Sequence, residues 1–184
     1  MWLFKGMKRI SKSLTALLMA TVLSISAVPT ALASNVSESE TGQVVSHSEE
    51  WVSPNKRVEV TVYDLGNGFT ATETITDEYV SGVQRASGTK TQTSTVEIKN
   101  KSVVAATITV SGTFSYDGSK AEVVKSSYSR TISSGYTEDQ WATGERDSSL
   151  LMGDALVNAI LIIKHDETGR TYTGTAQVTC SKNG

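Results

Sequence analysis

The sequence predicts an all-β protein: an antiparallel β-sandwich, Ig-like in the loose sense, with about seven to nine strands. Threonine and serine make up more than a quarter of the 184 residues, and threonine favours strands while serine favours turns. From residue 57 onward, apolar and polar residues alternate in short runs separated by glycine-containing turns, the pattern of half-buried strands. A small β-barrel is the alternative. The single cysteine excludes the paired cysteines of true immunoglobulin domains.

The first 33 residues are predicted to be a secretory signal peptide. An apolar run at residues 14–28 leads to the small-x-small motif of Ala31 and Ala33, and four cations precede the run without any acid: Lys5, Lys8, Arg9 and Lys12. We expect cleavage after Ala33. A membrane anchor is the rival interpretation, but the run is shorter than the roughly 20 residues that a spanning helix needs. The mature chain is therefore expected to be secreted and extracellular, without a membrane span.

The mature chain is predicted to begin at Ser34, whether translation starts at Met1 or at Met7. Residues 34–55 are rich in serine, glutamate and threonine and contain little to bury. We expect them to form a polar mobile leader or a loosely attached edge. The β-sandwich domain is then expected over residues 56–184.

Three strands are expected in the first part of this domain. Residues 57–62 alternate valine with polar residues, and a hairpin turn at residues 66–68 leads into a second alternating run at residues 69–76. The threonine face of this second run is expected to be solvated. A polar strand follows over residues 89–99.

The clearest strand spans residues 103–116, where apolar side chains share one face and hydroxyl side chains share the other. A run of this length usually bends or bulges, and Gly112 is the expected place. A turn at Asp117 and Gly118 leads back into a strand over residues 121–132. Three of its apolar side chains are expected to face inward: Val124, Tyr128 and Ile132.

The C-terminal third contains the longest irregular stretch, residues 133–149, which is predicted to be a loop. Residues 150–163 are apolar on both faces, so we expect a central strand, although their composition also permits a helix. The last strand, residues 170–180, is expected to pair with it. Alternation places Cys180 on the apolar side as a small buried residue; an exposed thiol that pairs between chains is the alternative.

Four segments resemble a group of small exported Gram-positive proteins. They are Ser-Gly-Thr-Lys at 87–90, Val-Ser-Gly-Thr-Phe-Ser-Tyr at 110–116, Asp-Gly-Ser at 117–119 and Val-Thr-Cys-Ser at 178–181. The resemblance covers residues 85–184. It implies a β-sandwich fold and export, and it transfers no activity and no catalytic residue.

Composition excludes several classes of function. The formal net charge of -2 disfavours a nucleic-acid-binding protein. One cysteine and two histidines are too few for a cysteine-based zinc site or a three-histidine metal centre, so no metal and no cofactor is expected. His47, in a polar segment, and His165, at a predicted hairpin tip, are expected to be solvated.

No set of residues in the sequence converges on catalysis. No Gly-x-Ser-x-Gly motif occurs. The acidic doublets at 77–78, 138–139 and 166–167 would place neighbouring side chains on opposite faces of a strand, which suits solubilising charge better than a glycosidase pair. Calcium bound by acidic loops is an alternative. We therefore expect no enzyme, with a secreted hydrolase as the lower alternative.

Aromatic side chains are the candidate ligand-binding groups. They are Tyr136 and Trp141, in the predicted loop at 133–149, and Trp51; loops commonly carry binding residues. The alternative is that the tryptophans cap the ends of the sandwich as core. We predict a non-enzymatic secreted module that binds an extracellular protein, a wall polymer or a cell-surface glycan. A small bacteriocin-like or toxin-like effector is the alternative.

Overall fold

The described part of the chain consists of nine strands joined by short connections. The computed structural model describes residues 42–80, 87–149 and 153–184, so the predicted signal peptide and its cleavage site lie outside it. The strands are β1 (Gln43–Ser53), β2 (Lys56–Gly66), β3 (Phe69–Tyr79), β4 (Gly88–Asn100), β5 (Val103–Tyr116), β6 (Ala121–Ile132), β7 (Tyr136–Arg146), β8 (Ala155–His165) and β9 (Thr171–Cys180).

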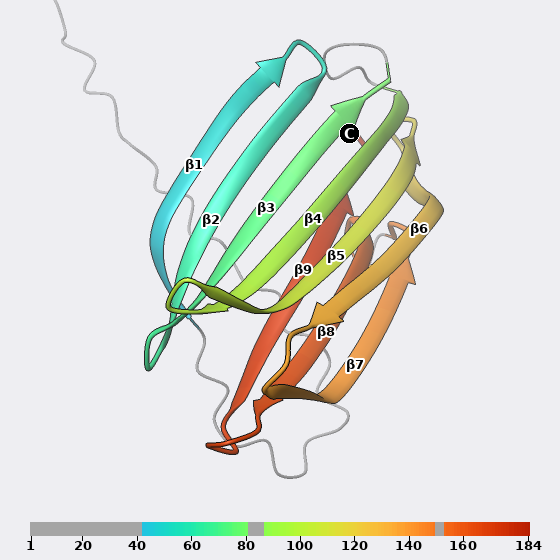
Figure 1. The fold of residues 1–184 in the computed structure, drawn as a ribbon. Helices are drawn as coiled ribbons and strands as arrows, with labels where there is room; N and C mark the ends of the chain where they lie inside the picture. The colour runs from blue at the N-terminus through green and yellow to red at the C-terminus, as the bar shows by residue number, and fades with distance from the viewer. Residues whose placement is uncertain (1–41, 81–86, 150–152) are drawn as a thin grey trace, which may run out of the picture. The chain divides into compact units, whose positions relative to one another are not determined.

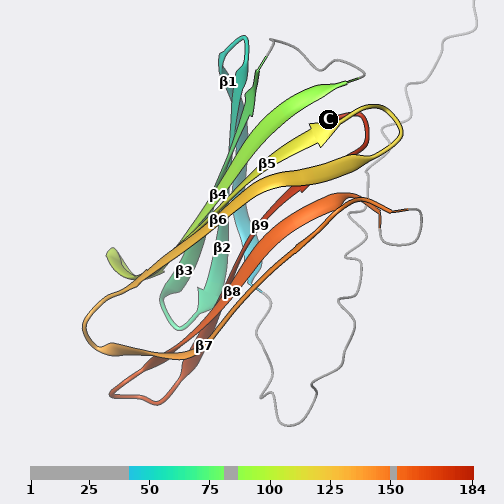
Figure 2. The same cartoon turned by 90° about the vertical axis from the view of Figure 1, so that its right-hand side faces the viewer.

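The strands form two antiparallel sheets that pack face to face, so the predicted β-sandwich is confirmed. Sheet A contains β1 to β6 and sheet B contains β7 to β9, each in the order of the sequence. Figure 1 shows the six strands of sheet A side by side, and Figure 2 shows the two layers from the side. Neither sheet closes into a barrel. Because the strand order is sequential, the likeness to immunoglobulin domains, which use Greek-key connections, is limited to the two layers.

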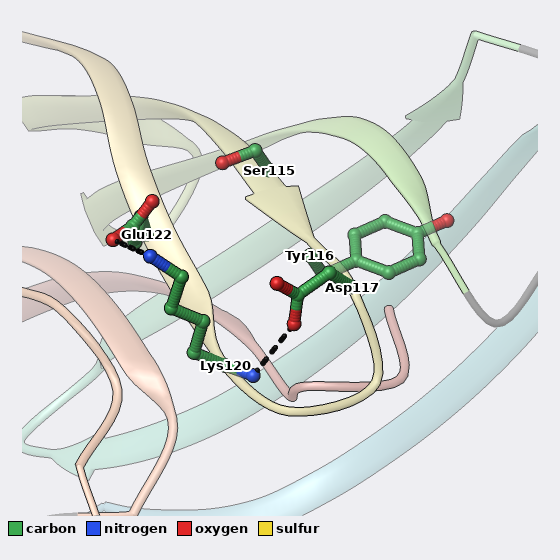
Figure 3. Close-up of a pocket in the computed structure, with 5 residues that line it drawn as sticks. All are labelled: Ser115, Tyr116, Asp117, Lys120 and Glu122. Carbon is green, nitrogen blue, oxygen red and sulfur yellow. Dashed lines mark hydrogen bonds and ion pairs between the residues drawn. The ribbon is translucent and has the colours of Figure 1, made fainter.

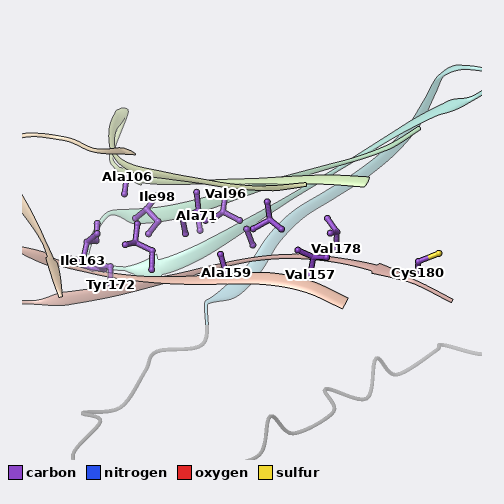
Figure 4. Close-up of a cluster of buried hydrophobic side chains, with 14 of the residues drawn as sticks. Ala71, Val96, Ile98, Ala106, Val157, Ala159, Ile163, Tyr172, Val178 and Cys180 are labelled. Carbon is purple, nitrogen blue, oxygen red and sulfur yellow. The ribbon is translucent and has the colours of Figure 1, made fainter. Parts of the chain in front are cut away.

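The hydrophobic core lies where sheet B covers the middle of sheet A. β9 packs against β4 and β5, while β8 packs against β5 and β6. Apolar side chains of both sheets fill the space between them, as Figure 4 shows for Ile98 of sheet A and Val157 of sheet B. Burial of each such side chain contributes about 1.5–3 kcal/mol. The core is therefore shared between the sheets and belongs to neither alone.

The outer face of sheet A carries a regular array of hydroxyl side chains. Cross-strand pairs join β4 to β5, with oxygen–oxygen distances of 3.1 Å for Thr91 and Thr113 and 3.3 Å for Thr95 and Thr109. The predicted solvated threonine face of residues 69–76 is part of this array, because Thr74 pairs with Thr95. Such pairs stabilise a sheet whose outer face meets water.

Of the two expectations for residues 34–55, a mobile leader or an attached edge, residues 43–53 fit the second, because they form the edge strand β1. Nine residues of β1 pair with β2, so the sandwich begins before the predicted boundary at residue 56. Periodicity failed here because β1 is exposed along nearly all its length and has two irregularities, at Val45 and Val52. The first part of the predicted leader, residues 34–41, lies outside the described residues.

The predicted loop at residues 133–149 is also wrong, because residues 136–146 form β7. Glu138 pairs with Ile163 and Gln140 with Ile162, so Asp139 is an extra residue that shifts the alternation by one. Only one face of this edge strand meets the core, and few of its side chains are apolar. A bulge in a polar edge strand removes the period of two on which the prediction depended.

The expected bulge at Gly112 and the expected inward position of Val124 are also wrong, because the bulges lie at other residues. Gly112 is not a bulge, because it pairs in regular register with Gln92 and Ser126. The irregularities lie instead at Ala105 in β5 and at Val124 in β6. As the extra residue of its bulge, Val124 is 63% exposed rather than inward-facing, whereas the other two predicted side chains, Tyr128 and Ile132, do pack against the core.

The segment with ambiguous periodicity, residues 150–163, contains the central strand of sheet B. β8 is a strand from Ala155 and pairs with both β7 and β9; residues 150–152 lie outside the described residues. The terminal hairpin of β8 and β9 is confirmed. Cys180 is buried, at 1% exposure, and burial raises the pKa of its thiol. The expected small buried residue is thus confirmed, and the alternative of an exposed thiol is wrong.

Candidate functional site: the open inner face of β1 to β3

Sheet B leaves part of the inner face of sheet A uncovered. β9 is an edge strand that packs on β4 and β5 and reaches only the margin of β3. β1 and β2 therefore extend past it, as Figure 1 shows. The inward-facing side chains of β1 to β3 along this part of the sheet are named the open shelf: His47, Glu49, Trp51, Arg57, Glu59, Thr61, Glu73, Ile75, Asp77 and Tyr79.

The alternation in β2 is reversed relative to a core strand. Cross-strand pairing places Val58, Val60 and Val62 on the outer face of sheet A, with the threonines of β3. The intervening residues, such as Arg57 and Glu59, face the same side as the core. Covering such a polar face with a second sheet would cost free energy unless its groups were hydrogen-bonded. The sequence of β2 is therefore adapted to an uncovered inner face.

Aromatic side chains form a platform at one end of the shelf. The rings of Trp51 and Tyr79 stack with their centroids 6.2 Å apart and their planes at 24°, and Trp51 remains 52% exposed. The ammonium group of Lys90 lies 6.0 Å from the centroid of the Tyr79 ring. Burial, and next the negative charge of Asp77, raise the pKa of Tyr79. Tyr79 itself is buried, at 7% exposure, so Trp51 is the ring that this pair exposes beside the charges.

A buried carboxylate organises the charges beside this platform. Asp77 is 1% exposed, and it accepts hydrogen bonds from Arg57 (Nε, 2.9 Å; Nη2, 2.5 Å) and from the Gln92 amide (2.5 Å). Lys90 Nζ lies 3.9 Å away. Burial lowers the pKa of Arg57, but the hydrogen bond and charge of Asp77 outweigh it and raise that pKa overall. Arg57 also reaches Glu49 at 3.3 Å.

A second carboxylate lies in the middle of the shelf with only hydroxyl donors. Glu73 accepts hydrogen bonds from Ser94 Oγ at 2.9 Å and from the Tyr63 hydroxyl at 3.3 Å. Burial raises the pKa of Glu73 more than these bonds lower it, and the charge of Glu59 adds to the rise. His47 lies alongside, with Nδ1 3.0 Å from the Thr61 hydroxyl.

The shelf combines an exposed indole ring with hydrogen-bond donors and acceptors held in place by neighbouring strands, groups that can contact a polar ligand. Among the described residues, no three His, Cys, Asp or Glu side chains gather as a metal site would require. The described part also contains no helix with the length and apolarity needed to cross a membrane.

The three sequence-predicted binding residues do not converge. Trp51 lies on the shelf, at the β1 edge of sheet A, whereas Tyr136 and Trp141 lie on β7 of sheet B. The Tyr136 ring packs edge-on against Phe69 and His165, at centroid distances of 6.3 Å and 5.0 Å. Tyr136 and His165 therefore have packing contacts that a solvated loop would not provide.

Trp141 belongs to a seam between β6 and β7. The guanidinium group of Arg130 lies 4.7 Å from the Trp141 ring centroid, and the same group donates to Glu138 at 2.5 Å and 3.1 Å. Trp141 is partly buried against the core. One face of its ring is thus occupied by a paired cation, and it is less suited than Trp51 to stack on a ligand.

A small hollow at the β5–β6 turn has a structural explanation. Figure 3 shows Asp117 and Lys120 at this turn. The Asp117 carboxylate accepts hydrogen bonds from the Ser119 hydroxyl at 2.5 Å and from the backbone N–H of Ser119 and Lys120, each at 2.9 Å. These bonds lower the pKa of Asp117 to about 2. Its oxygens serve the turn, so the hollow is not the candidate site.

Most shelf residues were not recognised in the sequence, although a signal for some was present. In β3, Asp77 lies on the same face as the apolar residues Phe69 and Ala71. In β4, Lys90 and Gln92 lie on the same face as Val96 and Ile98. Polar residues in core-facing positions indicate a buried network or a functional surface. Their mutual proximity depends on the pairing of β2, β3 and β4, which the periodicity of one strand does not reveal.

Comparison with known proteins identifies no relative. The chain matches no family model, and no curated protein or solved structure is similar enough to it to count as a match.

Proposed function

We propose that this protein is a secreted, non-enzymatic binding module whose open shelf holds an extracellular ligand: a glycan, a wall polymer or a protein. The observation that carries the proposal is Trp51, which is 52% exposed and stacked on Tyr79 beside the Asp77 network. The signal peptide predicted over residues 1–33 supports export, and the resemblance to small exported Gram-positive proteins supports a Gram-positive origin.

The arrangement of the shelf favours binding over turnover. Asp77 is engaged by cations, and Glu73 is held by two hydroxyl groups, so each carboxylate already has defined partners. An exposed ring beside oriented polar groups provides stacking and directional hydrogen bonds together, a combination suited to a sugar ring or an extended polymer. Support for the shelf is therefore stronger than for the seam at Trp141.

A binding screen with two tryptophan variants tests the proposal. Purified protein is titrated against whole Gram-positive cells and isolated wall glycans. We expect saturable binding that Trp51→Ala weakens at least about tenfold, a loss of about 1.4 kcal/mol. Trp141→Ala is the matched control, since it also removes one indole, and it should retain binding. Equal loss in both variants would contradict the proposed role of the shelf, and no saturable binding by the unaltered protein would contradict a cell-surface or glycan ligand.

A further inference from the structure

The four edge strands of the sandwich differ in how they are protected. β1, β6 and β7 all contain charged residues, and each has an irregularity in its pairing. β9 has neither: its ten residues include no charge, and its pairing with β8 is regular throughout. Bulges and charges are the usual means of preventing association at a sheet edge. β9 is thus an edge that remains competent to pair.

The open edge of β9 directs main-chain groups toward the shelf. The N–H of Thr179 donates to the side-chain oxygen of Gln92 on β4 at 2.7 Å, away from β8. Because main-chain direction alternates along an antiparallel strand, Thr173, Thr175 and Gln177 also direct N–H and C=O groups to this side. No strand among the described residues pairs with them. The described strands therefore leave a row of main-chain hydrogen-bonding groups unpaired beside the shelf.

The overhang of sheet A restricts what can occupy this edge. The first possible occupant is the β9 edge of a second copy of this protein. Antiparallel pairing of the two β9 strands would relate the copies by a twofold axis perpendicular to the sheets, so that both six-stranded sheets would lie in the same layer. The overhanging β1 and β2 of the two copies would then occupy the same space. A single extended segment avoids this clash, because it lies over the overhang, which at about 4.8 Å per strand is wide enough to hold it.

The charge of the shelf indicates the composition of that segment. Four carboxylates, of Glu49, Glu59, Glu73 and Asp77, face two cations, Arg57 and Lys90, on or beside the shelf. The arginine and the lysine are both close to Asp77, so the excess negative charge lies nearer the middle of the shelf. An inward-facing lysine or arginine would be complementary there.

We propose that the open edge of β9 binds an extended peptide segment of another protein as a fourth strand of sheet B, with a basic side chain directed at the shelf. This inference rests on the proposed binding function and specifies the partner class: an extended polypeptide recognised through its main chain. The outer-face side chains of β9 would contribute little, since Thr173, Thr175 and Gln177 are exposed on the opposite side of sheet B.

A synthetic peptide tests main-chain recognition directly. The probe has ten residues, the length of β9, and alternates threonine with valine, with lysine replacing one central valine. We expect saturable binding together with slower amide exchange at Thr173, Thr175 and Gln177. N-methylation of the peptide amides on one edge should abolish binding, while N-methylation on the other edge should leave it intact. Replacing the lysine by glutamate should weaken binding at least about tenfold.

Variants of β9 provide the matched test on the protein. Thr175→Pro removes one N–H from the open edge and leaves the bonds to β8 in place, so it should weaken peptide binding at least about tenfold. Thr175→Ala removes only the exposed side chain and should bind like the unaltered protein. If Thr175→Pro fails to fold, as judged by circular dichroism, the exchange measurement and the N-methylated peptides still decide the proposal.

The outcomes separate this inference from the proposed function. Binding to cells or wall glycans that depends on Trp51, without binding of the peptide, would overturn strand addition and leave the binding module standing. Peptide binding that is insensitive to N-methylation on either edge, or that protects no β9 amide, would also overturn it. Peptide binding without any cell or glycan binding would support an extracellular protein as the ligand.

Discussion

At the scale of single residues, the buried carboxylate of Asp77 and the partly buried carboxylate of Glu73 differ in their partners. Both lie on the inward face of β3, with one inward-facing residue between them. Asp77 has two cations and an amide as partners, whereas Glu73 has only hydroxyl donors. Burial without a cation disfavours the ionised form, so the pKa of Glu73 is raised. The middle of the shelf is thus sensitive to pH.

Replacement of Glu73 tests this pH sensitivity. Because the folded-state pKa of Glu73 is above its ordinary value of 4.5, the folded state binds the proton more tightly than the unfolded state. This contribution to stability is present below pH 4.5 and is lost as the pH rises through the folded pKa. We expect Glu73→Gln to remove that loss, so that the variant gains stability relative to the unaltered protein between pH 4 and pH 7.

Urea unfolding at both pH values measures the effect, with Glu50→Gln as control, since Glu50 is exposed on β1. An unchanged pH dependence of unfolding in Glu73→Gln would show that burial of this carboxylate has no energetic effect.

At the scale of elements, bulges decide where sequence periodicity succeeds. β4 and β9 alternate regularly between buried and exposed or half-buried positions along nearly their whole length, and both were predicted. β7 was missed because Asp139 shifts its alternation by one residue, and Val124 was misplaced by the bulge in β6. A bulge adds one residue to one strand, and no local pattern marks that residue in advance.

Gly112 shows what a glycine does in a regular strand. A Cβ atom there would lie 2.7 Å from Cζ of Phe114 and 3.1 Å from Cγ2 of Val157 on the opposite sheet. We expect Gly112→Ala to lower the free energy of unfolding by about 1–3 kcal/mol, because the core would be overpacked. Gly144→Ala is the control: its Cβ would meet only the Asn158 side-chain oxygen, which can move.

Thermal and urea unfolding of both glycine variants measure the difference. A cost for Gly112→Ala no larger than for Gly144→Ala would show that close packing between the sheets is not the reason for this glycine.

At the scale of the whole sandwich, the two long sides are unequal. Side chains of β6 and β7 meet along one side, where Arg130 pairs with Glu138 and Ser126 donates to Glu145 at 2.5 Å. The other side is open, since β9 stops over β4 while sheet A continues to β1. The closed side therefore stabilises the fold, and the open side contains both the shelf and the edge of β9 to which we propose that a peptide binds.

This asymmetry predicts a gradient of local stability across sheet A. β5 is central and buried by sheet B, whereas β1 is an edge strand that, among the described strands, pairs with β2 alone. We expect amide exchange to be slowest in β5 and β8 and fastest in β1, because local opening of β1 exposes little apolar surface. Exchange followed by mass spectrometry measures the gradient. Uniform protection from β1 to β5 would contradict it.

The sequence by itself determined the fold class and most of the strands, since period-two alternation and glycine turns are local properties of the chain. It also identified Trp51 as a candidate and placed Cys180 in the core. The unequal width of the sheets, the uncovered inner face and the unprotected edge of β9 were decided only by the tertiary structure. They depend on which strands pair and on where one sheet ends over the other, and those relations join residues that are far apart in the chain.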